Sequence, residues 1–501
     1  MATCETKKID SNVVGLNYTE EKCLGELQTD PKWQALEPNS YSDFGGELST
    51  ASRSPISASR QNKKGAVTDL SAKAGFEVDF TQTGLNDLMQ GLFFADNRKK
   101  VELPVTAVTG TGFTVASKGT DIKEKDIVKA SGFKTSALNK NFTVQTGSTA
   151  TEIKVGALTA AAEKGLLQVV GHAFASGDLH FTVENGIYGL TTTAGTLNTL
   201  GLIEGEWIFV GGDEPNSKFQ TAGTFYARIA TIAEKKITFD DGTFSSSSAL
   251  TADQGTGKSI EIYFGTVLKN ENEPSKIKRR SYTFERTLGK DTKANKDQAE
   301  YIKGAVFGEF SFSASQNEFL KAECKFTATN VEFKNEILLS NNKLTPAKGE
   351  SAFNTASDMR SMRLTLADKT KSASKPLFAY LTELSLEVNN NLSENKALGV
   401  FGAMDISAGN FEVKGSTTAY FATTEAQKAV FDYSDVGLSC IFAKDNAGFL
   451  FDIPLLGLGG GQNSVEKDNP ITISLDIEGA ENKHGYTMMY INFPYLPKVA
   501  M

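Results

Sequence analysis

Apolar and polar residues alternate with a period of two in several stretches of the chain. Phe76, Val78 and Phe80 alternate with Glu77 and Asp79, and the same alternation returns in residues 310–314, 384–388 and 471–478. Successive side chains of a strand point to opposite faces of a sheet, so this pattern predicts strands with one buried face and one wet face. The chain is therefore predicted to be mainly β.

A helical period of 3.6 residues is found in residues 83–96, which read TGLNDLMQGLFFAD. The apolar positions that share one side of this helix are Leu85, Leu88, Met89, Leu92 and Phe93. Thr83 is a residue type that accepts backbone N–H bonds at the start of a helix, so we expect it to be the N-cap. The apolar stripe is expected to dock the helix on a sheet.

The C-terminal third repeats this order of elements. GFEV at Gly75 has a counterpart in GNFEV at Gly409, and each is followed by Thr-rich sequence and a short helical pattern. The second helix is expected to begin with a capping box from Thr424 to Gln427 and to pack through Ala426, Ala429 and Val430. These echoes predict a duplicated β-helix-β domain whose first copy is split by an insertion.

The insertion is predicted from residue 103 to residue 264, where short Gly- and Thr-rich strands replace the helical pattern. Two stretches inside it, which begin at Asp121 and Gly201, resemble each other. The corresponding apolar positions are Ile127 and Val128 with Trp207 to Val210, Phe142 with Phe225 and Tyr226, and Ile153 and Val155 with Ile237 and Phe239. We expect two small β-barrel-like modules.

The domain boundaries follow from these changes of pattern. Residues 1–40 show neither period and are expected to form an N-terminal arm that needs a partner to become ordered. Residues 41–102 with 265–345 are expected to form the first domain, 103–264 the insertion, and 346–501 the second domain. The length of 501 residues agrees with several domains, because single cores stop growing at roughly 250 to 300 residues.

Composition and charge narrow the class of protein. The 45 Gly against 12 Pro and the 33 Phe against 2 Trp favour strands and turns, and the net charge of −8 argues against a reader of duplex DNA. The cysteines lie far apart, without a CxxC pair, so neither a zinc site nor a disulfide framework is expected; they are Cys4, Cys23, Cys324 and Cys440. The chain lacks a signal-peptide core and an apolar stretch of about 18 residues, so we expect neither export by a signal peptide nor a membrane span.

Two local sequences allow more than one interpretation. The basic run KIKRR, Lys276 to Arg280, is interpreted as a solvated loop, with a salt-bridge site between subunits as the alternative. The glycine-rich run LLGLGGGQN, from Leu455, lacks the GxGxxG spacing of a dinucleotide site and a following helix. We expect it to be a mobile hairpin loop.

Enzymatic chemistry finds little support. ADQGTGKS, Ala252 to Ser259, approaches a phosphate-binding P-loop, but Ala252 replaces the first Gly and the next segment reads as a strand instead of a helix. The three histidines, His172, His180 and His484, have no metal-ligand spacing, and no GxSxG nucleophile motif occurs. We expect no catalysis, no cofactor and no metal. A nucleotide-binding enzyme stays as a hypothesis that depends on residues 252–259 alone.

Three extended segments resemble one protein family. They are RSPISASRQNKKGAVTDLSAKAGFEVDF running into LNDLMQGLFF, FGEFSFSASQNEFLKAECKFTATN, and LSLEVNNNL through GNFEVKGSTTAYF. In this order they resemble the tail tube proteins, or major tail proteins, of long, non-contractile-tailed bacteriophages of the siphovirus type. The branch they are similar to carries two tube domains in one chain.

The resemblance implies a fold and a role. The fold would be mainly β, with two tandem tail-tube domains of β-sandwich or barrel type, each with one packed helix, plus the inserted small β modules. Three chains would close a pseudo-six-fold ring, with a hexamer as the alternative, and stacked rings would form the virion tail tube. The tape-measure protein and the DNA would pass through the lumen, tail-tip and tail-terminator proteins would bind the ends, and assembly would take place in the host bacterial cytoplasm.

Carboxylates on the wet faces of the predicted strands are candidates for the lumen wall. They are Glu77, Asp79, Glu412, Asp476 and Glu478. Such a wall would repel phosphate, whereas the alternative is that these side chains only solvate an outer face. A second hypothesis is a carbohydrate- or receptor-binding β protein of the virion. Only Trp33 and Trp207 are present as tryptophans for an aromatic platform.

Overall fold

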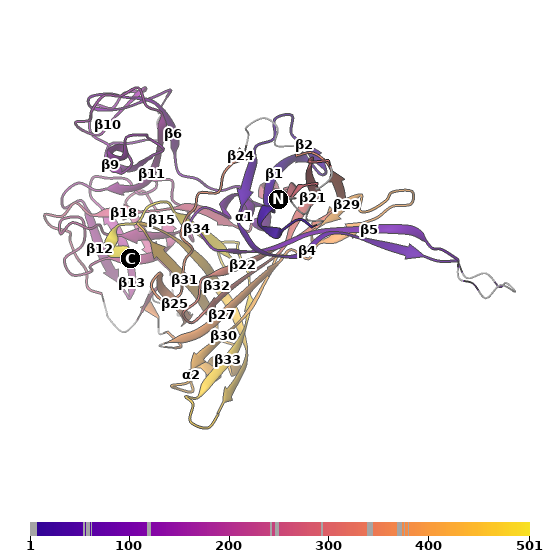
Figure 1. Cartoon of the computed structure of the whole chain (residues 1–501). Helices are drawn as coiled ribbons and strands as arrows, with labels where there is room; N and C mark the ends of the chain where they lie inside the picture. The colour runs from indigo at the N-terminus through magenta and orange to yellow at the C-terminus, as the bar shows by residue number, and fades with distance from the viewer. Residues whose placement is uncertain are drawn as a thin grey trace. The chain divides into compact units, whose positions relative to one another are not determined.

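Strands dominate the computed structural model, which confirms the predicted mainly β class (Figure 1). The described part of the chain comprises residues 8–53, 56, 61, 63–117, 122–240, 243–245, 250–291, 294–337, 344–367, 373–374, 376–378 and 380–501. It contains two α-helices, α1 (Asn86–Phe93) and α2 (Glu425–Phe431). Cys4, Asp121 and much of RSPISASRQN lie outside the described residues.

The chain forms two compact units. Unit 1 comprises Met1–Asp96, Asn270–Thr355 and Thr382–Thr417. Unit 2 comprises Asn97–Lys269, Ala356–Leu381 and Thr418–Met501. The domain boundaries expected from the sequence stay a prediction.

An antiparallel sheet forms the centre of unit 1. Its strand order is β4 (Pro38–Ala51), β5 (Ala66–Asp79), β22 (Lys321–Ala328), β21 (Asp297–Ser315) and β27 (Leu381–Asn389), and β30 (Glu412–Tyr420) follows β27. Phe76, Cys324, Phe310 and Val388 lie directly opposite one another on four neighbouring strands, and all four side chains are buried. The alternation in the sequence therefore builds one apolar face across the sheet.

The N-terminal segment differs from the expected arm. Residues 15–36 contain β1 (Gly15–Cys23), β2 (Glu26–Leu27) and β3 (Trp33–Leu36), and β1 pairs with β20 (Tyr282–Lys290) and with β3. Leu16, Tyr18 and Trp33 are buried. Tyr18 contacts the ring of Tyr282, and Trp33 packs with Tyr301. Both partners lie more than 260 positions later in the chain, where no local period can reveal them. Shorter strands complete unit 1: β23 (Asn330–Lys334), β24 (Leu344–Thr345), β28 (Ser393–Asn395) and β29 (Asp405–Ser407).

Helix α1 contacts β21 through the predicted stripe, and Leu85, Leu88, Met89, Leu92 and Phe93 are all buried. Its start differs from the prediction. Leu85 is the N-cap, and Thr83 instead bonds Glu350, with its hydroxyl 2.7 Å from Oε1 and its backbone N–H 2.8 Å from Oε2. A carboxylate distant in sequence offers Thr83 two charge-assisted bonds, which outweigh the weak local capping bond.

The main sheet of unit 2 is also antiparallel. Its order is β25 (Met359–Leu366), β31 (Val436–Lys444), β32 (Ala447–Ser464) and β33 (Thr472–Gly479), and β34 (Met489–Phe493) joins the first half of β32 to β19 (Thr266–Lys269). Ile473, Leu475 and Ile477 are buried and alternate with wetter side chains, as predicted.

Helix α2 contacts β32, and Ala426 and Ala429 are buried as predicted. The capping box expected from Thr424 to Gln427 is wrong. Thr424 is the N-cap but its side chain makes no capping bond, and the Gln427 amide points to the carbonyl of Gly461 at 3.4 Å. The side chain of Gln427 is thus used for a contact with β32 instead of the helix end.

The glycine run from Leu455 is part of strand β32, so the predicted hairpin loop is wrong. Gly457 lies opposite Glu478 and Gly459 lies opposite Asp476 on β33. The register shifts between Gly460 and Gln462, and Gly460 and Gly461 have φ angles of 73° and 86°. Only glycine adopts this left-handed backbone readily, so the run supplies a β-bulge within a paired strand.

The segment predicted as an insertion contributes strands to a second sheet of unit 2. The first group of its strands consists of β6 (Glu102–Val108), β7 (Gly112–Val115), β8 (Asp126–Ser131), β9 (Asn141–Thr143), β10 (Glu152–Lys154) and β11 (Gly165–Ala173). The second group consists of β12 (Leu179–Glu184), β13 (Ile187–Thr192), β14 (Trp207–Val210), β15 (Phe225–Ile232), β16 (Lys236–Phe239) and β18 (Glu261–Tyr263). Two further short strands, β17 (Phe244–Ser245) and β26 (Ala373–Ser374), pair in parallel.

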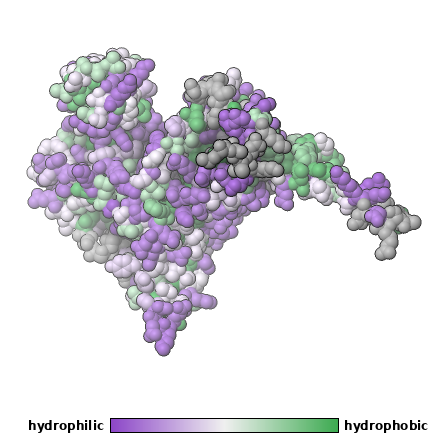
Figure 2. Space-filling view, in the orientation of Figure 1, coloured by the Kyte–Doolittle hydropathy of each residue, from purple (hydrophilic) through white to green (hydrophobic). Residues whose placement is uncertain are grey.

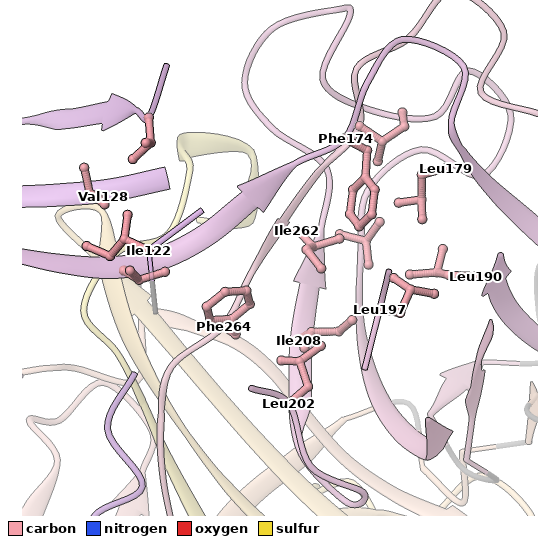
Figure 3. Close-up of a cluster of buried hydrophobic side chains, with 14 of the residues drawn as sticks. Ile122, Val128, Phe174, Leu179, Leu190, Leu197, Leu202, Ile208, Ile262 and Phe264 are labelled. Carbon is pink, nitrogen blue, oxygen red and sulfur yellow. The ribbon is translucent and has the colours of Figure 1, made fainter. Parts of the chain in front are cut away.

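One apolar cluster runs through both groups of strands. Figure 3 shows part of it, with Val128 of β8 in the first group and Ile208 of β14 and Ile262 of β18 in the second. Pairing of β11 with β18 connects the groups. The two stretches that resemble each other lie in different groups, and each contributes an antiparallel pair, β8 with β9 and β14 with β15. That they are two copies of one module stays a prediction.

Candidate functional site

The wet face of the unit 1 sheet brings together residues from four strands. Glu77 on β5 lies opposite Glu323 on β22, which lies opposite Ser311 on β21, which in turn lies opposite Glu387 on β27. The strand alternation that buries Phe76 and its neighbours turns this row to the other face. Two of the predicted lumen candidates, Glu77 and Asp79, therefore belong to one continuous surface.

The rows on either side complete this surface. One consists of Asp79, Lys321, Ser313 and Ser385, and the other of Gly75, Lys325, Glu309 and Asn389. We call these three rows of four residues the polar surface. They hold five carboxylates and two lysines, which leaves an excess of three negative charges.

Two lysines partly neutralise the negative charge of the polar surface. Lys321 Nζ lies 3.7 Å from Glu77, and Lys325 Nζ lies 3.5 Å from Glu309 and 3.7 Å from Glu323. These are exposed or half-exposed pairs, so each contributes little to stability. The surface can therefore present a net negative potential to a passing polyanion while its own carboxylates avoid strong mutual repulsion.

Sequence reasoning did not select Glu309, Glu323 or the two lysines of the polar surface. The alternation of apolar and polar residues, as in residues 310–314, shows which side chains of a single strand are wet. It does not show which strands become neighbours or in which register they pair, because such pairings join different strands, in the case of Glu77 and Glu323 more than 200 residues apart.

Glu412, another predicted lumen candidate, is on β30 in unit 1. Lys414 Nζ lies 3.0 Å from its carboxylate, and this hydrogen bond holds the pKa of Glu412 below its usual value. The side chain thus stays charged but is paired locally with an exposed lysine.

The remaining candidates, Asp476 and Glu478, are exposed on β33 of unit 2. The residues opposite them on β32 are Gly459 and Gly457, which have no side chains to cover them. Within the described ranges neither carboxylate has an ion-pair partner within 4.0 Å. These two carboxylates therefore differ from Glu77 and Glu412, each of which has a lysine within 4.0 Å.

The basic run at residues 276–280 lies largely exposed in a loop, as interpreted from the sequence, and its charged side chains pair inside unit 1. Lys276 pairs with Glu273 at 2.9 Å, Arg279 pairs with Asp405 at 3.3 Å, and Lys278 and Arg280 both pair with Asp96. The bond from Lys278 and those from Arg280 hold the pKa of Asp96 below its usual value. The run fastens the loop after α1 to neighbouring segments.

The histidines have structural contacts. His172 Nδ1 lies 2.8 Å from Asp126, His180 Nε2 lies 3.2 Å from the carbonyl of Gly177, and His484 Nε2 lies 3.4 Å from Asp240. Across the part of the chain that the structure describes, no three His, Cys, Asp or Glu side chains are grouped so that they could hold a metal ion. These contacts offer no nucleophile with an activating base.

The segment that resembles a P-loop is a turn that leads into strand β18. Asp253 accepts hydrogen bonds from the N–H groups of Thr221 and Gly255, and the Lys258 ammonium donates to the carbonyl of Pro215 at 2.9 Å. Lys258 and the loop backbone thus form hydrogen bonds within the protein. The next element is strand β18, so no helix N-terminus follows that could bind a phosphate.

One protein-family model matches most of the chain. A family model described as phage tail tube protein matches residues 11–479. The chain belongs to the phage tail tube protein family. It is therefore a structural component of a phage tail, and members of this family self-assemble into a tube. No curated protein matches the chain.

Family membership confirms the resemblance to phage tail tube proteins, and it places this tail tube protein in a structural family instead of an enzyme family. Neither α1 nor α2 in the described chain has the length and apolar character that a membrane crossing requires.

Proposed function

We propose that copies of this chain close into rings that stack into the hollow tail tube of a long, non-contractile-tailed phage of the siphovirus type, and that the genome passes through it during ejection. The polar surface is the observation that carries this proposal beyond the family match. An excess of carboxylates on a wall repels the phosphates of DNA, so the DNA slides without binding.

In this proposal the polar surface, Glu412 and the pair Asp476 and Glu478 face the lumen. Lys321 and Lys325 limit the negative potential at the wall, because they lie among the carboxylates. The alternative is that these side chains solvate an outer face, and variants in which the charge is reversed separate the two, as described below.

Ring closure would use the free edge of the unit 1 sheet. Strand β4 has 14 residues and pairs with β5 on one side, and none of the described strands pairs with its other side. Figure 1 shows β4 and β5 running on together as a ribbon beyond the remainder of unit 1. A long unpaired edge is an aggregation hazard unless another chain covers it, so a neighbouring subunit is its natural partner.

The stoichiometry follows from the two tube domains predicted in one chain. Three chains would give a pseudo-six-fold ring, and a hexamer is the alternative. The inserted β modules would project outward, because added mass inside would block the lumen. The tape-measure protein and DNA would occupy the lumen, tail-tip and tail-terminator proteins would bind the ends, and assembly would take place in the host bacterial cytoplasm.

Negative-stain electron microscopy of the purified protein tests this function. Striated hollow cylinders are the expected result, and averaged end views give the number of subunits in a ring. Compact monomers that persist at high protein concentration and in the presence of tail-tip proteins would contradict the proposal.

The second hypothesis, a carbohydrate- or receptor-binding protein, draws no support from the tryptophans. Trp33 and Trp207 are both buried, so neither provides an exposed aromatic platform for a sugar ring. We therefore do not propose it.

A further inference from the structure

A loop in unit 1 exposes several large apolar side chains. Residues 396–404 connect β28 to β29, which pair as a two-stranded ribbon. The side chains of Leu398, Val400, Phe401 and Met404 are 105%, 46%, 57% and 59% exposed. Single exposed apolar residues are common on proteins, but a contiguous group marks an interaction surface. We call residues 396–404 the apolar loop.

The apolar loop is held in place by charged contacts on both sides. Lys396 pairs with Asp69 and, at 2.9 Å, with Glu394, and Ser71 donates a hydrogen bond of 2.9 Å to Glu394. At the other end Asp405 pairs with Arg279. These bonds tie the loop to β5 and to the basic run, so its conformation is set before any partner binds. Such pre-organisation reduces the entropy lost on association.

The loop also joins an apolar part of the β4–β5 ribbon. Gly402 of the loop is buried and packs closely against unit 1. A Cβ at this position would lie 2.9 Å from the carbonyl oxygen of Thr329 and 3.7 Å from the side chain of Leu70. Leu48, which is half-exposed, lies directly opposite Leu70 in the ribbon. Figure 2 shows a hydrophobic area beside this ribbon. The loop and Leu48 thus form one apolar patch on unit 1.

We propose that the apolar loop docks on a second copy of this chain, at the exposed end of helix α2. This inference rests on the proposed function, because a tube of identical chains brings surfaces of different copies together. Positions 397–404 carry no charged residue, so the loop suits neither DNA nor an ionic partner. It requires an apolar counter-surface.

The end of α2 offers such a counter-surface in unit 2. The side chains of Phe431 and Tyr433 are 89% and 78% exposed, although they follow the buried positions Ala426 and Ala429 of the same segment. The apolar loop and the end of α2 are different surfaces, so their contact is heterologous. Heterologous contacts extend assemblies into rings or filaments, as a tube requires.

Assembly of a double variant tests the docking surface. Leu398→Ser with Phe401→Ser should leave the fold unchanged, because both side chains are exposed, and should raise the protein concentration needed for tube formation about tenfold or more. The control is Phe319→Ser, which should leave this concentration unchanged. Phe319 is an exposed phenylalanine that precedes β22, whereas Thr329, which lies against the apolar loop, follows the other end of that strand. Tube formation by the double variant at the wild-type concentration would overturn the inference.

A photoreactive amino acid at position 398 separates this inference from the proposed function. We expect cross-links from one copy to residues 425–433 of another, even in oligomers shorter than a tube. If wild-type protein forms no tube, the proposed function fails, whereas this cross-link still supports the docking surface. If tubes form and position 398 cross-links to other segments, to another kind of protein or to nothing, the docking surface is wrong.

Discussion

The side-chain amide of Asn390 donates a hydrogen bond of 2.9 Å to the backbone carbonyl of Leu92, 298 residues earlier in the chain. The same amide donates a second bond of 2.9 Å to the carbonyl of Phe307 on β21. Asn390 thus satisfies a carbonyl at the C-terminal end of α1, where backbone acceptors lack helical partners, and holds the helix against the sheet.

Replacement of Asn390 by leucine should therefore destabilise unit 1. Two buried carbonyls lose their donor, and each unsatisfied buried group costs about 1–3 kcal/mol. Urea unfolding followed by the fluorescence of Trp33 in a Trp207→Phe background measures this loss. Asn410→Ala is the control and should leave the unfolding midpoint unchanged, because Asn410 is exposed and its backbone carbonyl, which accepts a bond from Asn391, is kept. An Asn390→Leu protein as stable as wild type would contradict this role.

Charge reversal on the polar surface should slow genome ejection. In a phage that carries Glu77→Lys, Glu323→Lys and Glu387→Lys, the wall gains positive charge and binds DNA phosphates. Ejection measured by release of a DNA-binding dye should be slower than in wild type, and most strongly so at low salt. Matched lysine substitutions at Glu124, Glu163 and Glu184, which lie in unit 2 strands of the predicted insertion or their loops, are the control. Unchanged ejection would show that the polar surface does not face the DNA.

The buried pair of Arg228 and Asp452 in unit 2 should not tolerate loss of one partner. Arg228 Nη1 lies 3.0 Å from Asp452, and burial raises the pKa of Asp452 although Arg228 opposes this effect. Arg228→Met leaves the carboxylate buried and unpaired, at a cost of about 3–5 kcal/mol near neutral pH. Urea unfolding followed by Trp207 fluorescence measures the loss, and the double variant Arg228→Met with Asp452→Leu should recover part of it. Equal stability of the single variant and wild type would contradict the prediction.

Asp178 should make the stability of unit 2 depend on pH. Burial raises the pKa of Asp178, but hydrogen bonds from the N–H groups of Ala194 and Gly195 and from the Thr193 hydroxyl outweigh it and lower the pKa to about 2. Because the pKa is lower in the folded state than in the unfolded state, the contribution is complete above about pH 5 and is lost as the pH falls toward 2.

The variant Asp178→Asn measures this contribution. Its unfolding midpoint should lie below that of wild type at pH 7, and the gap should narrow between pH 5 and pH 3. Asp476→Asn, at an exposed carboxylate, is the control and should show only a small gap. A constant gap for Asp178→Asn across this range would exclude the proposed linkage.

Alanine substitutions at neighbouring glycines of β32 should differ in their effect on stability, because only some of these glycines form the bulge. Gly460→Ala and Gly461→Ala place a side chain on a left-handed backbone, which costs about 1–2 kcal/mol for each residue. Gly459→Ala is the matched control, because its backbone is not left-handed and a Cβ there meets ordinary contact with Asp476 at 3.4 Å. Unfolding of the three variants in urea gives the comparison, and three equal midpoints would contradict a strained bulge.

The sequence by itself determined which side of each long strand is wet and which stripe of α1 is buried. Phe76 is buried and the adjacent Glu77 is wetter, and the same holds for Ile477 and Glu478. The backbone geometry of a strand alone turns such adjacent side chains to opposite faces. The order of such segments also sufficed to indicate the tail tube family, which the family match confirmed.

The tertiary structure alone decided the register and the long-range polar contacts. Glu77 lies opposite Glu323, Thr83 bonds Glu350 instead of capping α1, and the glycines after Leu455 pair with β33 instead of forming a loop. The partners of Glu77 and Thr83 lie more than 240 residues away along the chain. In all three cases the free energy of pairing exceeds the weak local preference for a cap or a turn. Local pattern therefore fixes the faces of the elements, and packing between distant segments fixes what each face meets.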